Sequence, residues 1–149
     1  MLATLKLDTS VRGLRLTRKG ELAASGKGEI TLLNPLTLKT ARRWASPVKG
    51  QLIYLESLPD GTLVAPSIAD GGVVWIKHAR APRFFFTRKG ALNVRLGPDG
   101  KLYVANVDDD HVTVVSKAGM VIGQIGHGIK GPNGLAFGNC PAMSRAHLK

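Results

Sequence analysis

The chain alternates short apolar runs with turn-forming residues along most of its length. Its best-formed stretch holds four such runs in a row: LNVRL (92–96), KLYVAN (101–106), HVTVVS (111–116) and MVIGQI (120–125). Alternating apolar and polar positions rich in β-branched residues are typical of half-buried strands. The pattern predicts strands near residues 14–18, 21–25, 29–34, 40–45, 52–57, 62–66, 73–78, 82–87, 92–96, 101–106, 111–116 and 120–125.

Turn residues repeat along the chain with a fixed spacing. Gly20, Gly61 and Gly100 are 41 and 39 residues apart, and each lies between two predicted strands. In Pro98-Asp99-Gly100 the proline presets φ, the aspartate caps the turn and the glycine accepts a positive φ. Four short strands in each period of about 40 residues are typical of a β-propeller blade. A generic antiparallel meander is the alternative, and the matched turns favour blades.

The sequence therefore predicts an all-β fold, a partial β-propeller of about three four-stranded antiparallel blades plus an incomplete fourth. Residues 1–138 would form the partial propeller and 139–149 an irregular tail. The predicted blades cover about 11–47, 48–87 and 88–128, and a fragment of the next covers 129–138.

Three blades do not close a propeller, which needs at least four. The chain would be a truncated piece of a larger propeller, a partial propeller that assembles into a ring, or an open stack of three blades. The truncated piece is the preferred interpretation. Both ends of an open arc leave strand edges and sheet faces uncovered, so self-association through them is predicted.

Two segments resemble known propeller repeats. Residues 98–126, PDGKLYVANVDDDHVTVVSKAGMVIGQIG, resemble the NHL and YVTN classes, and GPNGLAF (131–137) resembles the start of a further NHL repeat. The resemblance extends over about residues 11–138 and implies a propeller. It does not imply one activity, because such repeats serve many functions.

Charge and cysteine content add little about the compartment. The formal net charge is +11, from 21 basic and 10 acidic side chains, and Cys140 is the single cysteine. A lone cysteine permits a reducing compartment such as the cytoplasm without establishing it, so the localisation is left open. No apolar run approaches the length that crosses a membrane, and no membrane partner is predicted.

The basic residues follow the repeat. A basic residue and a glycine open each predicted unit, and these openings carry Arg12, Lys49, Lys89 and Lys130. They should lie on one face near the inner strands, where clustered positive charge would attract a protein or another anionic ligand. Ordinary loop chemistry, with glycine for the turn and lysine for solubility, explains the pattern equally simply. A second basic group is interpreted as a solvated surface; it comprises Arg42, Arg43, Arg80 and Arg83.

Nucleic acid is a less favoured partner. Single-stranded RNA is bound through exposed aromatic side chains as well as through charge. Here Trp44, Trp75, Tyr54, Tyr103 and 84–86 all fall within predicted strands. Aromatic residues at such positions usually pack in the core.

Metal chemistry is a secondary hypothesis. Asp108 and Asp110 lie in an acidic loop with oxygen ligands of the kind calcium prefers, but without the spacing of a known calcium loop. GPNGLAF also resembles the regucalcin and gluconolactonase family of calcium-dependent lactone hydrolases, and the resemblance makes Asn133 a metal ligand. That family needs acidic partners on other inner strands, which the unit openings GLRL, GQLI and GALN do not offer.

No catalytic set of residues is predicted, and no cofactor apart from this calcium hypothesis. The preferred function is a non-enzymatic propeller scaffold that binds a ligand or protein through its basic openings. One alternative is a fragment of a regucalcin-like metal-dependent hydrolase. The other is an RNA or polyanion binder with a basic face.

Overall fold

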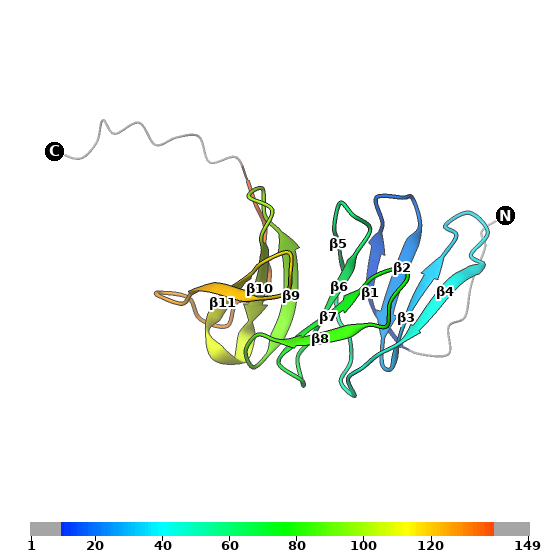
Figure 1. The fold of residues 1–149 in the computed structure, drawn as a ribbon. Helices are drawn as coiled ribbons and strands as arrows, with labels where there is room; N and C mark the ends of the chain where they lie inside the picture. Colours follow the sequence, from blue (N-terminus) through cyan, green and yellow to red (C-terminus); the bar gives the residue numbers. More distant parts are fainter. Residues whose placement is uncertain (1–9, 139–149) are drawn as a thin grey trace.

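The computed structural model describes residues 10–138 and contains three four-stranded antiparallel sheets arranged in an arc (Figure 1). In each sheet the strands follow their chain order, as the repeat predicted. The first sheet comprises β1 (Val11–Leu16), β2 (Leu22–Gly26), β3 (Glu29–Leu33) and β4 (Thr40–Ala45). The second comprises β5 (Glu56–Ser57), β6 (Leu63–Ser67), β7 (Gly72–Ile76) and β8 (Arg83–Phe86). The third comprises β9 (Ala91–Leu96), β10 (Leu102–Asn106), β11 (His111–Val115) and β12 (Val121–Ile125).

The turn between the first two strands has the same hydrogen bonds in all three sheets. The amides of Gly20, Gly61 and Gly100 each donate a hydrogen bond of 3.0 Å to the carbonyl oxygen three residues earlier. Their φ values are 78°, 82° and 75°, in the left-handed region that favours glycine. The recurring glycine thus predicted both the position of the turn and its geometry.

The main departure from the predicted strands is β5, which covers only two residues of the expected 52–57. Tyr54 interrupts the strand because its φ is 54°. Its carbonyl accepts a hydrogen bond of 3.2 Å from the Ser25 hydroxyl, and its backbone lies against Gly13 of β1. Before this interruption, Leu52 forms only an isolated bridge to Ser67. Contacts with the preceding sheet therefore shorten the strand that the local sequence predicted.

Two apolar clusters join the sheets face to face. The first lies between sheets one and two and includes Ile30, Leu32, Leu55 and Val74. The second lies between sheets two and three and includes Val64, Trp75, Val94, Leu102 and Val115. Neighbouring sheets thus bury apolar side chains against each other. This burial is the main stabilising contribution in such repeat architectures.

The connections divide between two faces of the arc. The opening face carries the turns between second and third strands, together with the segments that lead into first strands. The hairpin face carries the turns between first and second strands and between third and fourth strands. This division follows from the consecutive antiparallel strand order of all three sheets.

The first sheet leaves apolar side chains of its inner strand uncovered. Leu14 and Leu16 on β1 are 61% and 62% exposed. Leu14, Leu55 and Val94 each lie six positions before the turn glycine of their own blade. Leu55 and Val94 are only 3% and 1% exposed, because a preceding sheet covers them. The difference is consistent with an uncovered sheet face, and self-association through it stays a prediction.

Residues 131–138 follow the third sheet without forming a strand. The Phe137 ring nevertheless packs edge-on against Tyr103 of β10, with ring centroids 5.0 Å apart. Leu96 of β9 occupies the same repeat position as Phe137, and Val64 occupies the same repeat position as Tyr103. Leu96 packs against the cluster that contains Val64. The segment therefore lies where the inner strand of a further blade would lie, with Phe137 at the position that ends β9. The predicted tail, residues 139–149, lies outside the described residues.

Candidate ligand-binding face

Two of the predicted basic openings lie beside turns of the opening face. Lys49 precedes Gly50, whose amide donates a hydrogen bond of 3.0 Å to Asp70 Oδ2 in the β6–β7 turn. Lys89 precedes Gly90, whose carbonyl accepts 2.9 Å from the amide of Val107. A Cβ on Gly90 would lie 2.5 Å from the Asp108 nitrogen, so only glycine permits this approach. Both lysines are exposed.

The other two openings lie at the same end of their blades. Lys130 is exposed and precedes Gly131, whose amide donates 2.8 Å to Asp110 Oδ1. Arg12 is exposed at the irregularity of β1, where the pairing with β2 shifts between Val11 and Gly13. All four predicted residues therefore lie at the opening ends of successive blades, and their role in binding stays a prediction.

A hollow of about 410 Å³ lies on this face beside Lys89. Its walls include Ile68 from the β6–β7 turn, Phe86 at the end of β8, and Asp108. Phe86 is 63% exposed, although the sequence pattern predicted a packed aromatic residue here. A second hollow of about 370 Å³ is also lined by Phe86 and Lys89 and reaches Gln124. The first hollow thus combines the apolar Phe86 ring and the Lys89 cation with two carboxylates, Asp70 and Asp108.

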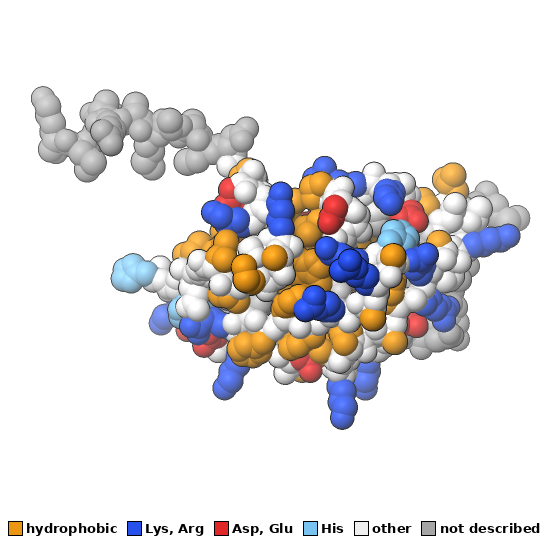
Figure 2. Space-filling view, viewed as in Figure 1, with side chains coloured by type: hydrophobic (Ala, Val, Ile, Leu, Met, Phe, Trp, Pro, Cys, Tyr) orange, Lys and Arg blue, Asp and Glu red, His pale blue; other side chains and the backbone are white. Residues whose placement is uncertain are grey.

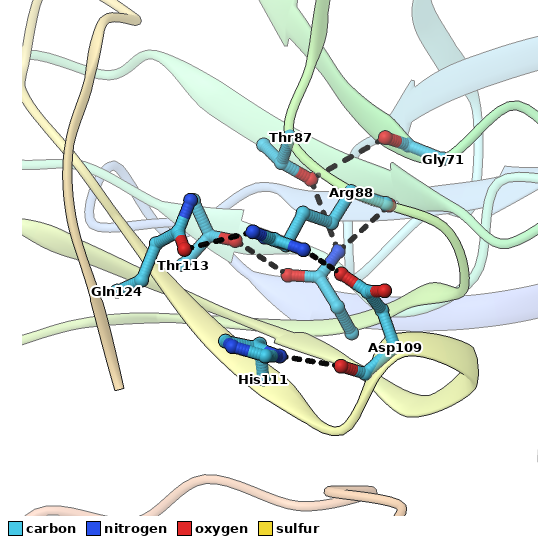
Figure 3. Close-up of polar contacts among 8 residues, drawn as sticks. Gly71, Thr87, Arg88, Asp109, His111, Thr113 and Gln124 are labelled. Carbon is cyan, nitrogen blue, oxygen red and sulfur yellow. Dashed lines mark hydrogen bonds and ion pairs between the residues drawn. The ribbon is translucent and has the colours of Figure 1, made fainter. Parts of the chain in front are cut away.

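A buried amide fixes the loop that carries Lys89. Asn106, at the end of β10, is fully buried, and its Nδ2 donates to Thr87 Oγ1 at 3.2 Å and to the Arg88 carbonyl at 2.8 Å. Its Oδ1 accepts 2.8 Å from Thr113 Oγ1. Figure 3 shows these contacts between the β8–β9 connection and the third sheet. The sequence analysis did not identify this network.

Arg88 adds an ionic contact to the same loop. Its guanidinium lies between Asp109 and Gln124 in Figure 3, donating to Asp109 Oδ2 and, at 2.8 Å, to Gln124 Oε1. The hydrogen bond from Arg88 holds the pKa of the Asp109 carboxyl below its ordinary value, and the positive charge of nearby Lys89 acts in the same direction.

The Arg88 contact predicts a measurable pH effect. Because the Asp109 pKa is lowered, this carboxylate stabilises the fold above its ordinary pKa of 3.8 and loses that contribution as pH falls through the lowered value. We expect Arg88→Met to raise the Asp109 pKa toward 3.8 in an NMR titration of the carboxyl carbon. Asp99 is the control, because Lys101 lowers its pKa on the hairpin face and should still do so. An unchanged Asp109 pKa would contradict the assigned contact.

The residues of the metal hypothesis are not brought into a cluster with other ligands. Asp110 bonds the Gly131 amide, and Asp108 and Asn133 are exposed. Among residues 10–138 no group of three or more His, Cys, Asp or Glu side chains could hold a metal ion. The calcium and hydrolase hypotheses stay predictions.

An ionic triad joins the three inner strands and was missed by the sequence analysis. The Glu56 carboxylate on β5 is 5% exposed and lies 2.7 Å from Arg15 Nη2 of β1 and 3.6 Å from Arg95 Nη1 of β9. The Ser57 amide donates to it at 2.9 Å and the Leu96 amide at 3.4 Å. Each triad residue lies five positions before its turn glycine, so the repeat alignment held the signal. Both oxygens of the buried Glu56 carboxylate thus have partners, and the carboxylate acts as a contact between blades.

Basic side chains are spread over the visible surface in Figure 2 and project from several of its edges, with fewer acidic ones between them. On the opening face, three acidic side chains are already bonded within the protein: Asp70 to Ser67 and Gly50, Asp109 to Arg88, and Asp110 to Gly131. The described part of the chain has no helix that is long and apolar enough to cross a membrane.

Comparison with known proteins identifies the fold alone. No protein family profile and no curated protein sequence matches the chain, so NHL or YVTN membership stays a prediction. Virginiamycin B lyase from Staphylococcus aureus, with quinupristin, superimposes with a TM-score of 0.75 at 18% identity, covering 87% of this chain and 45% of that one. Hydrazine synthase from Kuenenia stuttgartiensis superimposes with a TM-score of 0.75 at 19% identity, covering 87% of this chain and 40% of that one.

The β-propeller domain of Cps50 (Swd1) from Myceliophteria thermophila gives a TM-score of 0.66 at 12% identity, covering 84% of this chain and 43% of that one. The chain thus spans less than half the length of each of these structures. Three consecutive four-stranded sheets with this likeness define a partial β-propeller. The class includes enzymes and non-enzymatic scaffolds, so the fold leaves the activity undetermined.

Proposed function

We propose that this partial propeller is a non-enzymatic binding scaffold whose opening face receives an acidic segment of a partner protein. The observation that carries the proposal is the exposed Phe86 ring beside the exposed Lys89 in a hollow of about 410 Å³. Aromatic side chains are enriched at protein interfaces, and cations steer acidic partners toward them.

The surrounding contacts support this proposal by limiting movement of the face before binding. Asn106 holds the backbone of the Lys89 loop, and Asp70 joins the β6–β7 turn to Gly50. A surface fixed in advance loses less conformational entropy on binding. The charge of Asp109 is offset within the protein by Arg88, whereas Asp70 and Asp108 line the same hollow as Lys89 and an acidic partner would meet them too.

The test uses fluorescent poly-glutamate as the probe and anisotropy at increasing salt concentrations. We expect the triple variant Lys49→Ser, Lys89→Ser and Lys130→Ser to bind about tenfold more weakly, with a smaller dependence on salt. Arg12 is left in place because it lies within β1, so all three changes are in loops.

The matched control removes the same charge from loops of the hairpin face: Arg18→Ser, Lys19→Ser and Lys39→Ser. It should lower affinity much less than the opening-face variant. Phe86→Ser should lower affinity while leaving the salt dependence unchanged, because it removes apolar contact and no charge. Equal losses from the two triple variants, or tighter binding of single-stranded RNA to the same face, would contradict the proposal.

A further inference from the structure

A separate basic hollow lies on the hairpin face, between the β7–β8 turn of the second blade and the β11–β12 turn of the third. Its volume is about 80 Å³, which is room for a few water molecules or for one group of similar size. Four cationic side chains line it, Lys77, Arg80, Arg83 and Lys117, above the rings of Trp75 and Phe85. Arg80 and Arg83, interpreted from sequence as a solvated surface, thus meet a lysine from the next blade.

Within residues 10–138, no acidic side chain lines this hollow. Among the described residues, none of its four cations forms an ion pair with a carboxylate. Asp60 lines an adjoining hollow with Lys117, and its Oδ1 accepts a hydrogen bond of 3.0 Å from the Thr62 amide. The positive charge of Lys77 also acts on the Asp60 carboxylate, which makes Asp60 a partial counter-charge for this cluster. Four cations beside one carboxylate still repel one another, and a bound anion would relieve that repulsion.

The walls of the hollow are held by packing that does not involve an anion. Trp75 and Phe85 meet edge to face with centroids 5.7 Å apart, and the Arg83 guanidinium lies 5.1 Å from the Phe85 centroid. Gly119 packs directly against the Phe85 ring, which draws the Lys117 turn of the third blade onto the second. The amide of Gly119 also closes that turn with a bond of 3.0 Å to the Ser116 carbonyl.

We propose that this hollow binds one phosphate group. Guanidinium groups bind phosphate oxygens through paired N–H donors, and lysines add point charges. The volume of about 80 Å³ suits a single tetrahedral oxyanion, and four cations favour a divalent anion over a monovalent carboxylate. The site uses none of the residues of the opening face and is independent of the function proposed there.

The experiment titrates the full chain with inorganic phosphate at constant ionic strength and follows the backbone amides by NMR. We expect saturable shifts confined to the β7–β8 and β11–β12 turns and their flanking strands. Acetate at the same ionic strength should give no saturable shifts. The double variant Arg80→Ser and Lys117→Ser should weaken phosphate binding about tenfold or more, whereas Lys49→Ser with Lys89→Ser should leave it unchanged.

A second variant distinguishes the specific site from general charge. Arg80→Lys with Arg83→Lys retains the charge but removes the paired donors, so it should weaken phosphate binding while circular dichroism confirms the fold. Shifts spread over all cationic surfaces, equal binding of acetate, or equal losses in the opening-face control would overturn the proposal. A phosphoserine peptide that shifts the same amides would assign the phosphate to a modified protein, and binding of inorganic phosphate alone would assign it to a free anion; both outcomes support the site.

Discussion

We expect Glu56→Ala to lower the free energy of unfolding by about 2–4 kcal/mol, measured by urea titration with tryptophan fluorescence. The carboxylate is 5% exposed and is the shared partner of Arg15 and Arg95, which belong to different blades. Its removal also leaves the Ser57 and Leu96 amides without their side-chain acceptor. Because both arginines are about one-third exposed, water compensates part of the loss.

Glu29→Ala is the matched control. The Glu29 carboxylate is 23% exposed and lies 4.0 Å from Arg43 within a single blade. Its loss also removes a hydrogen bond of 3.3 Å from the buried Thr31 hydroxyl, and it should cost about 1 kcal/mol, less than the loss of Glu56. If both variants had the same midpoint in urea as the unmodified chain, the triad would not stabilise the contact between blades.

The second large effect is expected at Asn106. Asn106→Ala should lower the free energy of unfolding by about 2–4 kcal/mol, because it removes three hydrogen bonds and leaves the buried Thr113 hydroxyl without its acceptor. Hydrogen–deuterium exchange should also show faster exchange in the loop that contains Arg88, which Asn106 connects to β10.

Asn93 on the adjacent strand provides a direct comparison. It is also buried, but its Oδ1 accepts no hydrogen bond among the described residues. Asn93→Ala should therefore destabilise the chain by less than Asn106→Ala, by about 1 kcal/mol or less. An equal loss for both asparagines would show that side-chain volume, rather than the hydrogen-bond network, accounts for the effect.

Local sequence signals predicted most of the architecture. The glycine turns at Gly20, Gly61 and Gly100 depend on residues within four positions, so the sequence contains their cause. Alternation likewise predicted β10 and β11, whose residues pair in continuous register from Leu102–Val115 to Asn106–His111. The shortening of β5 was not predicted, because the positive φ of Tyr54 accompanies contacts with a different blade.

The surface features of the candidate sites were harder to predict, for the same reason. The repeat predicted where Lys49 and Lys89 lie. It did not predict the exposure of Phe86, because a position in a strand does not reveal whether another segment of the protein covers the side chain. The hollow depends on two turns that meet through packing on Phe85, and their residues Arg80 and Lys117 are 37 positions apart. Net charge could not distinguish this hollow from a solvated surface.

The charges of the inner strands give the blades a fixed order. Arg15, Glu56 and Arg95 occupy one repeat position with the sequence positive, negative, positive. Replacing the second blade by a copy of the first would place three arginines side by side, and replacing the first by a copy of the second would place two carboxylates together in a partly buried setting. The blades are therefore not interchangeable, although their strand order and turns are alike, and the acidic blade must lie between the two basic ones.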